Sequence, residues 1–200
     1  IDPVKFPNAF RVTPSNDQWD GAVRNYCQKV VKAKKVAIVA DATGYGTSAR
    51  DDSVASFTKA GFEIVYSGVI DPAQPDVTPD VLRMKNSGAE AIVAWSVSAG
   101  LSSRIMNARA SLGWDVPIVG HPAMGTGEIG RLVAKPENWE KVYIVGYKSC
   151  SFDDAGKLPA QTQAFVDAVK GKIKLDDTSL WWVVSGVDAI RLVAEAVAKS

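Results

Sequence analysis

The chain has 200 residues, of which 46% are hydrophobic and 22% are charged, and its formal net charge is +1. This composition is ordinary for a globular protein with room for one large domain or a domain and a fraction. The near-neutral charge argues against nucleic-acid binding, which normally shows as a basic stripe. No apolar run approaches the roughly 20 residues of a membrane helix, and the first residues lack the plan of a signal peptide.

The predicted elements alternate between strands and helices. Residues 1–15 contain three prolines and are expected to be extended, and Ser15 or Asn16 is expected to cap a helix that reaches about residue 32. The expected strands are 35–41, 62–70, 89–97, 116–120 and 141–147, and the helices between them are 46–60, 79–87, 99–112 and 126–135. The strands are nearly continuous in Val, Ile and Ala, which is typical of a parallel sheet covered on both faces. We therefore predict a doubly wound α/β domain with about five parallel strands.

The C-terminal part of the sequence differs from the rest. After Tyr147 the pattern predicts two helices and no further strand, and the last helix carries an apolar stripe from Val183 to Val197. Two apolar helices with little sheet to cover suggest that a neighbouring layer is missing. We therefore expect this chain to be part of a longer protein.

The single histidine and the two cysteines limit the chemistry that the chain can perform. They cannot supply a four-ligand zinc site, and we expect no metal and no cofactor. No nucleophile elbow or other catalytic arrangement is evident, so we expect a protein that is not an enzyme. Cys27 lies on an apolar helix stripe, where a buried thiol is the default, and a disulfide with Cys150 in an oxidising compartment is the open alternative.

The turns that follow the strands are the expected location of a ligand, because open α/β sheets bind ligands at the carboxyl ends of their strands. The first such turn reads "DATGYGTS" and has two glycines, Gly44 and Gly46, on either side of Tyr45. It lacks the lysine of a phosphate-binding Walker loop and the third glycine of a dinucleotide fingerprint. Tyr45 would obstruct a pyrophosphate, but it could close over a small organic molecule. A nucleotide-binding or enzymatic domain that uses residues 41–48 for phosphate is the alternative interpretation.

Several segments, in order and at matching spacing, resemble the type 1 periplasmic binding proteins. They are "FRVTPSNDQ", the Gly-Tyr-Gly turn after "VAIV", "KAGFEIV", "SGAEAIV", "ARASLG…VPIVG" and "VDAIRLVAEAV". The sequence is most similar to the leucine/isoleucine/valine-binding branch, the solute receptors of ABC importers. The resemblance implies two lobes joined by crossovers, a small ligand in the cleft between them, and a membrane permease as partner. It implies a crossover at 1–16, a ligand-binding lobe at 17–150 and a return toward the other, absent lobe at 151–200. It also implies a periplasmic or extracellular location, with a signal peptide that is not in this chain.

The resemblance also implies which side chains of this lobe contact the ligand. The family's tyrosine contact falls on Tyr45 beside Gly44, and a second contact turn falls on Trp95, Ser96 and Ser98. The position where amino-acid binders place an acid for the ligand ammonium falls on His121 or Pro122, and neither is an acid. A buried ammonium without a carboxylate partner is costly. The expected ligand is therefore an aromatic or other organic acid, with a branched-chain-type amino acid as the less favoured choice.

Overall fold

The computed structural model describes residues 4–175 and 179–199, and the chain divides into two compact units. One unit spans Asn16–Gly146 and contains all five of the strands that are described. The other unit comprises the described residues on either side of it. In the part of the chain that the structure describes, no helix is both long enough and apolar enough to cross a membrane.

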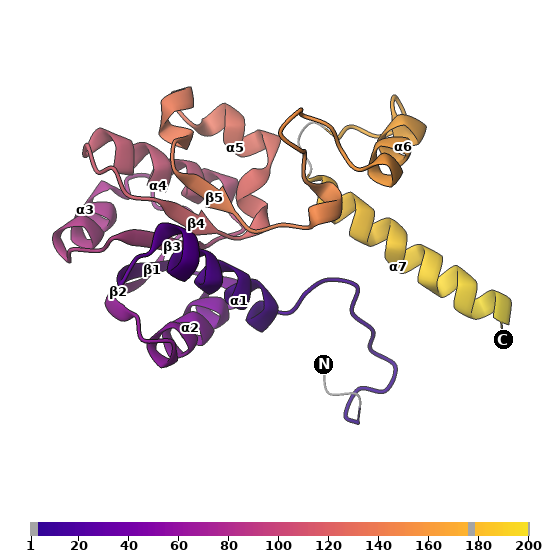
Figure 1. Ribbon diagram of the computed structural model, residues 1–200, viewed down its shortest axis with the longest axis horizontal. Helices are drawn as coiled ribbons and strands as arrows, with labels where there is room; N and C mark the ends of the chain where they lie inside the picture. The colour runs from indigo at the N-terminus through magenta and orange to yellow at the C-terminus, as the bar shows by residue number, and fades with distance from the viewer. Residues whose placement is uncertain (1–3, 176–178, 200) are drawn as a thin grey trace. The chain divides into compact units, whose positions relative to one another are not determined.

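The sheet of the larger unit is five-stranded and entirely parallel, in the order β2-β1-β3-β4-β5 (Figure 1). Its strands are β1 Lys35–Asp41, β2 Glu63–Ile70, β3 Ala91–Trp95, β4 Ile118–Gly120 and β5 Val142–Ile144. From β1 the chain moves outward to β2 on one side and then to β3, β4 and β5 on the other. The strand order therefore reverses between β1 and β3, where ligands bind in folds of this kind. The predicted α/β class with five parallel strands is confirmed.

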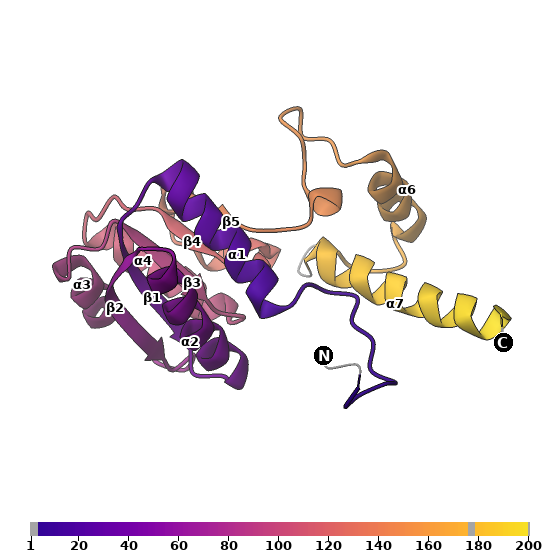
Figure 2. The ribbon, with the colours of Figure 1, turned by 60° about the horizontal axis from the view of Figure 1, so that its bottom comes forward.

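Helices cover both faces of this sheet, as Figures 1 and 2 show. The helical elements are α1 Asn16–Tyr26, the π-helix η1 Cys27–Val31, α2 Gly44–Lys59, α3 Thr78–Asn86, α4 Ala99–Ser111, the 3-10 helix η2 Pro122–Gly125, α5 Gly127–Leu132 and the 3-10 helix η3 Pro136–Trp139. Helices α3, α4 and α5 pack on the face that carries Ala37, Val39 and Ile92. Helices α1 and α2 contact the strands from the opposite face. Strand residues are consequently buried on both sides, as their uninterrupted apolar sequence predicts.

Two details of this unit bear on the sequence predictions. The predicted strand 89–97 pairs only over Ala91–Trp95, because the Val97 amide donates to the Asp41 side chain and not to a neighbouring strand. Cys27 is fully buried, and both Cys27 and Cys150 are free thiols. The buried thiol is therefore confirmed, and the disulfide alternative is not realised in this structure.

The smaller unit contains the 3-10 helix η4 Lys148–Cys150 and the helices α6 Ala160–Val169 and α7 Leu180–Lys199. The two predicted helices are thus present, and no strand occurs among the described residues after Tyr147. Near the start of α7, Trp181 stacks on Trp182 with ring centroids 4.2 Å apart. Further along α7 the apolar residues Ile190, Val193 and Val197 are exposed. This helix therefore has an apolar stripe that the described residues leave uncovered.

Candidate ligand-binding site

The carboxylate of Asp41 joins two of the turns at the carboxyl edge of the sheet. Its Oδ1 accepts hydrogen bonds from the Thr43 amide, at 3.2 Å, and from the Thr43 hydroxyl. Its Oδ2 accepts from the Val97 amide at 2.8 Å. Asp41 is 0% exposed, so these bonds form inside the protein, where charge-assisted hydrogen bonds are strong. The turn after β1 and the turn after β3 are thereby fixed to each other at the point where the strand order reverses.

The turn before α2 is built by a threonine cap and by one glycine that a side chain could not replace. Thr43 is the N-cap of α2, and its Oγ1 accepts from the Gly46 amide at 3.0 Å. A Cβ on Gly46 would collide with the backbone and carboxylate oxygens of Asp41, whereas a Cβ on Gly44 would meet nothing within 4 Å. The second glycine therefore permits close packing over Asp41. With a carboxylate beneath the turn and the cap already on the helix end, this turn is poorly suited to a phosphate.

His121 directly follows β4, the neighbour of β3 in the sheet, and is held as a neutral imidazole. Its Nδ1 accepts a hydrogen bond from the Ala123 amide at 3.1 Å, which places the proton of the neutral ring on Nε2. The side chain caps η2 through this bond and is 4% exposed. Burial lowers the pKa of His121 to about 4, and the opposing effect of the Asp41 charge is smaller. His121 is therefore uncharged at neutral pH.

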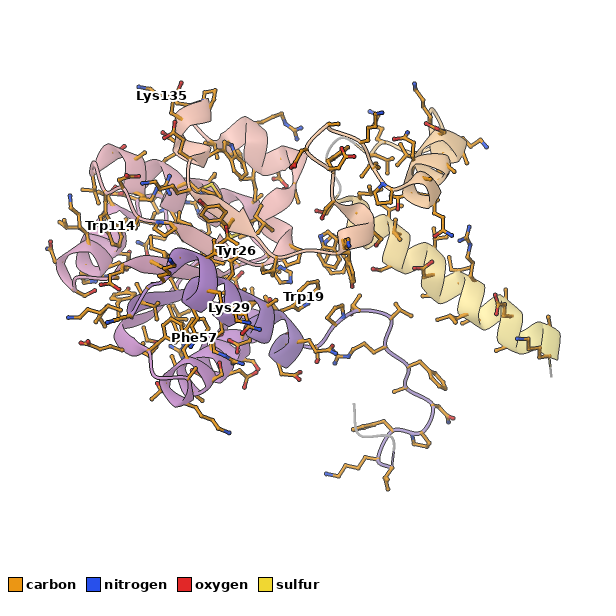
Figure 3. All side chains as sticks on the ribbon, viewed as in Figure 1. Trp19, Tyr26, Lys29, Phe57, Trp114 and Lys135 are labelled. Carbon is orange, nitrogen blue, oxygen red and sulfur yellow. The ribbon has the colours of Figure 1, made fainter. Side chains whose placement is uncertain are left out.

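Three aromatic rings surround His121. The ring centroid of Tyr45 lies 5.2 Å from that of His121, and the ring centroid of Trp95 lies 6.4 Å from it. The Trp19 indole meets the imidazole edge-on at 6.0 Å. Trp19 comes from the first turn of α1, where Figure 3 labels it. The structure thus brings Tyr45, Trp95 and His121 together at the ends of three strands, and it adds Trp19, which is not among the site residues predicted from the sequence.

The remaining predicted site residues are also at this edge, and the hydroxyl groups among them serve the turns. Ser96 Oγ accepts from the Ser98 amide at 3.0 Å, and Ser98 Oγ caps α4 by accepting from the Leu101 amide at 3.2 Å. Pro122 is the buried first residue of η2, and Gly44 is the exposed first residue of α2. These bonds give the two serines a role in shaping the turn, and contact of these four residues with a ligand stays a prediction.

Two polar atoms of the aromatic group are buried without a hydrogen-bond partner among the described residues. They are the hydroxyl of Tyr45 and the indole Nε1 of Trp95. Burial and the charge of Asp41 both raise the pKa of Tyr45, so its hydroxyl keeps its proton. The described residues contain no group of three or more His, Cys, Asp or Glu side chains that could hold a metal ion.

The fold and this edge define a class of protein: an α/β lobe that presents aromatic side chains where its parallel strands end. The family model described as "Periplasmic binding protein" matches residues 2–200, and the chain belongs to that family. Within the family the chain resembles the leucine/isoleucine/valine-binding proteins. The family consists of binding proteins, which confirms the expectation that the chain is not an enzyme.

Relatives of known sequence are similar to part of the chain. The Leu/Ile/Val-binding protein homolog 3 of Brucella melitensis is 30% identical over 99 residues, which cover 48% of this chain and 27% of that protein. An amino acid binding protein of Pseudomonas aeruginosa is 33% identical over 84 residues, which cover 42% of this chain and 22% of that protein. The matched region therefore spans about a quarter of the length of these curated relatives.

Solved structures agree with the fold over almost the whole chain. The leucine binding protein LivK of Thermotoga maritima superimposes with a TM-score of 0.76 at 17% identity, covering 94% of this chain and 51% of that one. A solute binding protein of an ABC transporter from Rhodopseudomonas palustris, in complex with p-hydroxybenzoic acid, gives a TM-score of 0.75 at 23% identity and covers 94% and 50%. The chain thus spans about half the length of these structures.

Proposed function

We propose that this chain is part of the extracytoplasmic solute-binding subunit of an ABC importer. The observation that carries the proposal is the meeting of Tyr45, Trp95 and His121 at the strand-order reversal of a chain that belongs to the periplasmic binding protein family. A small organic solute would lie against these rings, in a cleft between this lobe and a second one. Rings of this kind supply large contact areas, and a few directed hydrogen bonds then set the orientation of the ligand.

The roles of the chain's segments follow from this proposal. Residues 17–150 would form one lobe, residues 1–16 a crossover between the lobes, and residues 151–200 a return toward the other lobe. The exposed apolar stripe of α7 supports such a return, because a helix of this kind needs a further layer to cover it. Ligand-induced closure of the two lobes would create the form that docks on a membrane permease, in the periplasm or at the cell exterior.

The ligand class under this proposal is an aromatic or other organic acid, or a branched-chain-type amino acid. Relatives of the same fold support both choices. The structure from Rhodopseudomonas palustris contains p-hydroxybenzoic acid, and a branched-chain amino acid transporter substrate binding protein from Streptococcus pneumoniae was solved with isoleucine.

A thermal-shift screen of the full-length protein tests the proposal. The screen would contain aromatic acids, aliphatic acids, amino acids and nucleotides. A ligand that binds only the folded protein raises its melting temperature, by an amount that grows with concentration over Kd. We expect stabilisation by organic acids or amino acids and none by nucleotides. Stabilisation by nucleotides alone would overturn the proposal and favour a phosphate site at residues 41–48.

A further inference from the structure

The aromatic group of the site contains two hydrogen-bond donors that need an acceptor. The Trp95 side chain is 1% exposed, and its Nε1 has no hydrogen-bond partner among the described residues. The Tyr45 hydroxyl is likewise buried and unpartnered within the described part of the chain. An indole nitrogen can only donate, and a buried donor without an acceptor is unfavourable. Both rings lie beside the same imidazole ring, so the two side chains belong to one aromatic group.

The Asp41 carboxylate at this edge of the sheet already accepts hydrogen bonds from the protein itself. Both oxygens of Asp41 accept hydrogen bonds from the turns at Thr43 and Val97, and the residue is 0% exposed. The next acids along the chain, Asp51 and Asp52, are exposed on α2, and Asp51 pairs with Arg50. Within the described residues, an ammonium group brought to these rings would therefore lose its water without gaining a carboxylate that is not already hydrogen-bonded, which is costly.

The second ring nitrogen of His121 is also a hydrogen-bond donor. The Nδ1 lone pair of this ring is used by the Ala123 amide, so the nitrogen that is not part of the cap carries a proton. The two unpartnered polar groups beside this ring, within the described part of the chain, are a phenol hydroxyl and an indole N–H. Both groups can donate to an oxygen acceptor, and the indole N–H has no lone pair to offer a cationic donor.

We infer that this lobe selects an organic acid without an α-amino group, and that an acceptor oxygen of the ligand lies against Tyr45 and Trp95. The inference rests on the proposed function, because it assigns the ligand class of the same site. The rings of Trp19, Tyr45 and Trp95 make an aromatic or otherwise planar acid the best match, since faces and edges of rings pack well together.

The test measures the affinity of the full-length, ligand-free protein for two matched pairs by isothermal titration calorimetry. The pairs are 3-phenylpropanoate with phenylalanine, and 4-methylpentanoate with leucine, which differ only in the α-amino group. We expect the acid of at least one pair to bind at least tenfold more tightly than its amino acid. Equal or tighter binding of both amino acids would overturn the inference while leaving the solute-receptor proposal intact. If no acid and no amino acid binds and nucleotides do, both would be wrong.

Two variants that remove a donor and keep a ring test the same inference at the level of single atoms. Trp95→Phe and Tyr45→Phe should each weaken binding of the preferred acid by about tenfold or more, as expected for loss of a hydrogen bond to a charged group. Trp114→Phe is the matched control, because Trp114 lies at the opposite end of this unit from Trp19 (Figure 3). Wild-type affinity in both donor variants, with melting temperatures unchanged, would contradict the inference.

Discussion

The indole of Trp19 meets the imidazole of His121 edge-on, with ring centroids 6.0 Å apart and ring planes at 78°. The next residue, Asp20, holds the helix that carries Trp19 in place. The Asp20 carboxylate accepts hydrogen bonds from the hydroxyls of Ser53 and Ser56 on α2 and from Arg24 on α1. Helix α1 is therefore anchored on α2 at the position that directs Trp19 to the site.

Truncation of Trp19 should affect both stability and the site. Trp19 is 7% exposed, and Trp19→Ala would leave a cavity beside His121, so we expect the free energy of unfolding to fall by about 3 kcal/mol. Urea unfolding of the full-length protein measures this change. Trp19→Phe keeps an aromatic edge against the imidazole, so it should lose less than half of the stability that Trp19→Ala loses. An unchanged urea midpoint for Trp19→Ala would show that the contact is not formed in solution.

Tyr45 should matter for binding more than for folding. It is only half-buried and projects from a capped turn that forms without its side chain, because the cap is made by Thr43. We expect Tyr45→Ala to lower ligand affinity at least tenfold, or by about 1.4 kcal/mol, with little change in the melting temperature of the unliganded protein. Calorimetry measures the ligand affinity, and a thermal melt measures the melting temperature. Normal ligand binding by this variant would remove Tyr45 from the site.

Replacement of Asp41 should disturb the backbone of the two turns that its carboxylate holds together. In Asp41→Asn one carboxylate oxygen becomes an NH₂ group, so one of the amides of Thr43 and Val97 would face a donor. We expect a loss of about 2 kcal/mol of stability and weaker binding. Asp52→Asn is the control, because Asp52 is exposed on α2. Equal stability of the two variants would contradict this role of Asp41.

The stability of the lobe should depend on the ionisation of His121 in mildly acid solution. Burial lowers its pKa from 6.5 to about 4, with Asp41 opposing the shift and the neutral Tyr45 on its other side. Between these pH values the unfolded chain binds a proton that the folded protein does not. The free energy of unfolding is therefore unaffected by His121 ionisation above pH 6.5, and it falls by about 3 kcal/mol as the pH drops toward 4.

A comparison with His121→Gln isolates this effect, because glutamine does not titrate. Urea unfolding of both proteins at several pH values between 4 and 7.5 gives the difference in their free energies of unfolding. We expect the wild type to lose stability relative to the variant as the pH falls below 6.5. Parallel pH profiles would mean that His121 is not buried as a neutral ring.

Cys27 should be chemically silent in the folded protein. Burial raises its pKa to about 12, and the charge of Asp20 adds to this effect, so very little thiolate exists at pH 8. In a Cys150→Ser variant, which leaves Cys27 as the cysteine of this chain, a chromogenic disulfide reagent should detect no Cys27 thiol before urea is added. Rapid reaction without denaturant would contradict the buried position of Cys27.

The sheet could be predicted from the sequence because its evidence is local. Each strand is a short apolar run, each helix has a periodic pattern, and their alternation admits few topologies. Tyr45, Trp95 and His121 could be singled out with the help of the resemblance to the periplasmic binding proteins, and the structure brings them together because the ends of parallel strands meet at one edge.

The rest of the site depends on contacts between distant segments. Asp41 bonds to an amide 56 positions away, and this bond also ends β3 earlier than its sequence suggests. Trp19 could not be recognised, because a tryptophan on an amphipathic helix has the same pattern whether it packs in a core or at a site. Ser96 and Ser98 show the converse, since hydroxyls that the sequence offers for a ligand take part in the turn.

The hydrogen bond from the Ala123 amide to the ring of His121 has a consequence for which residues position 121 can hold. What this bond requires of residue 121 is an acceptor at the start of η2, and an aspartate would meet that requirement as well as a histidine. Exchange of one for the other would preserve the backbone while replacing a neutral N–H by a negative charge. Under the proposed function, this single exchange would change the charge that a ligand meets while leaving the surrounding rings as they are.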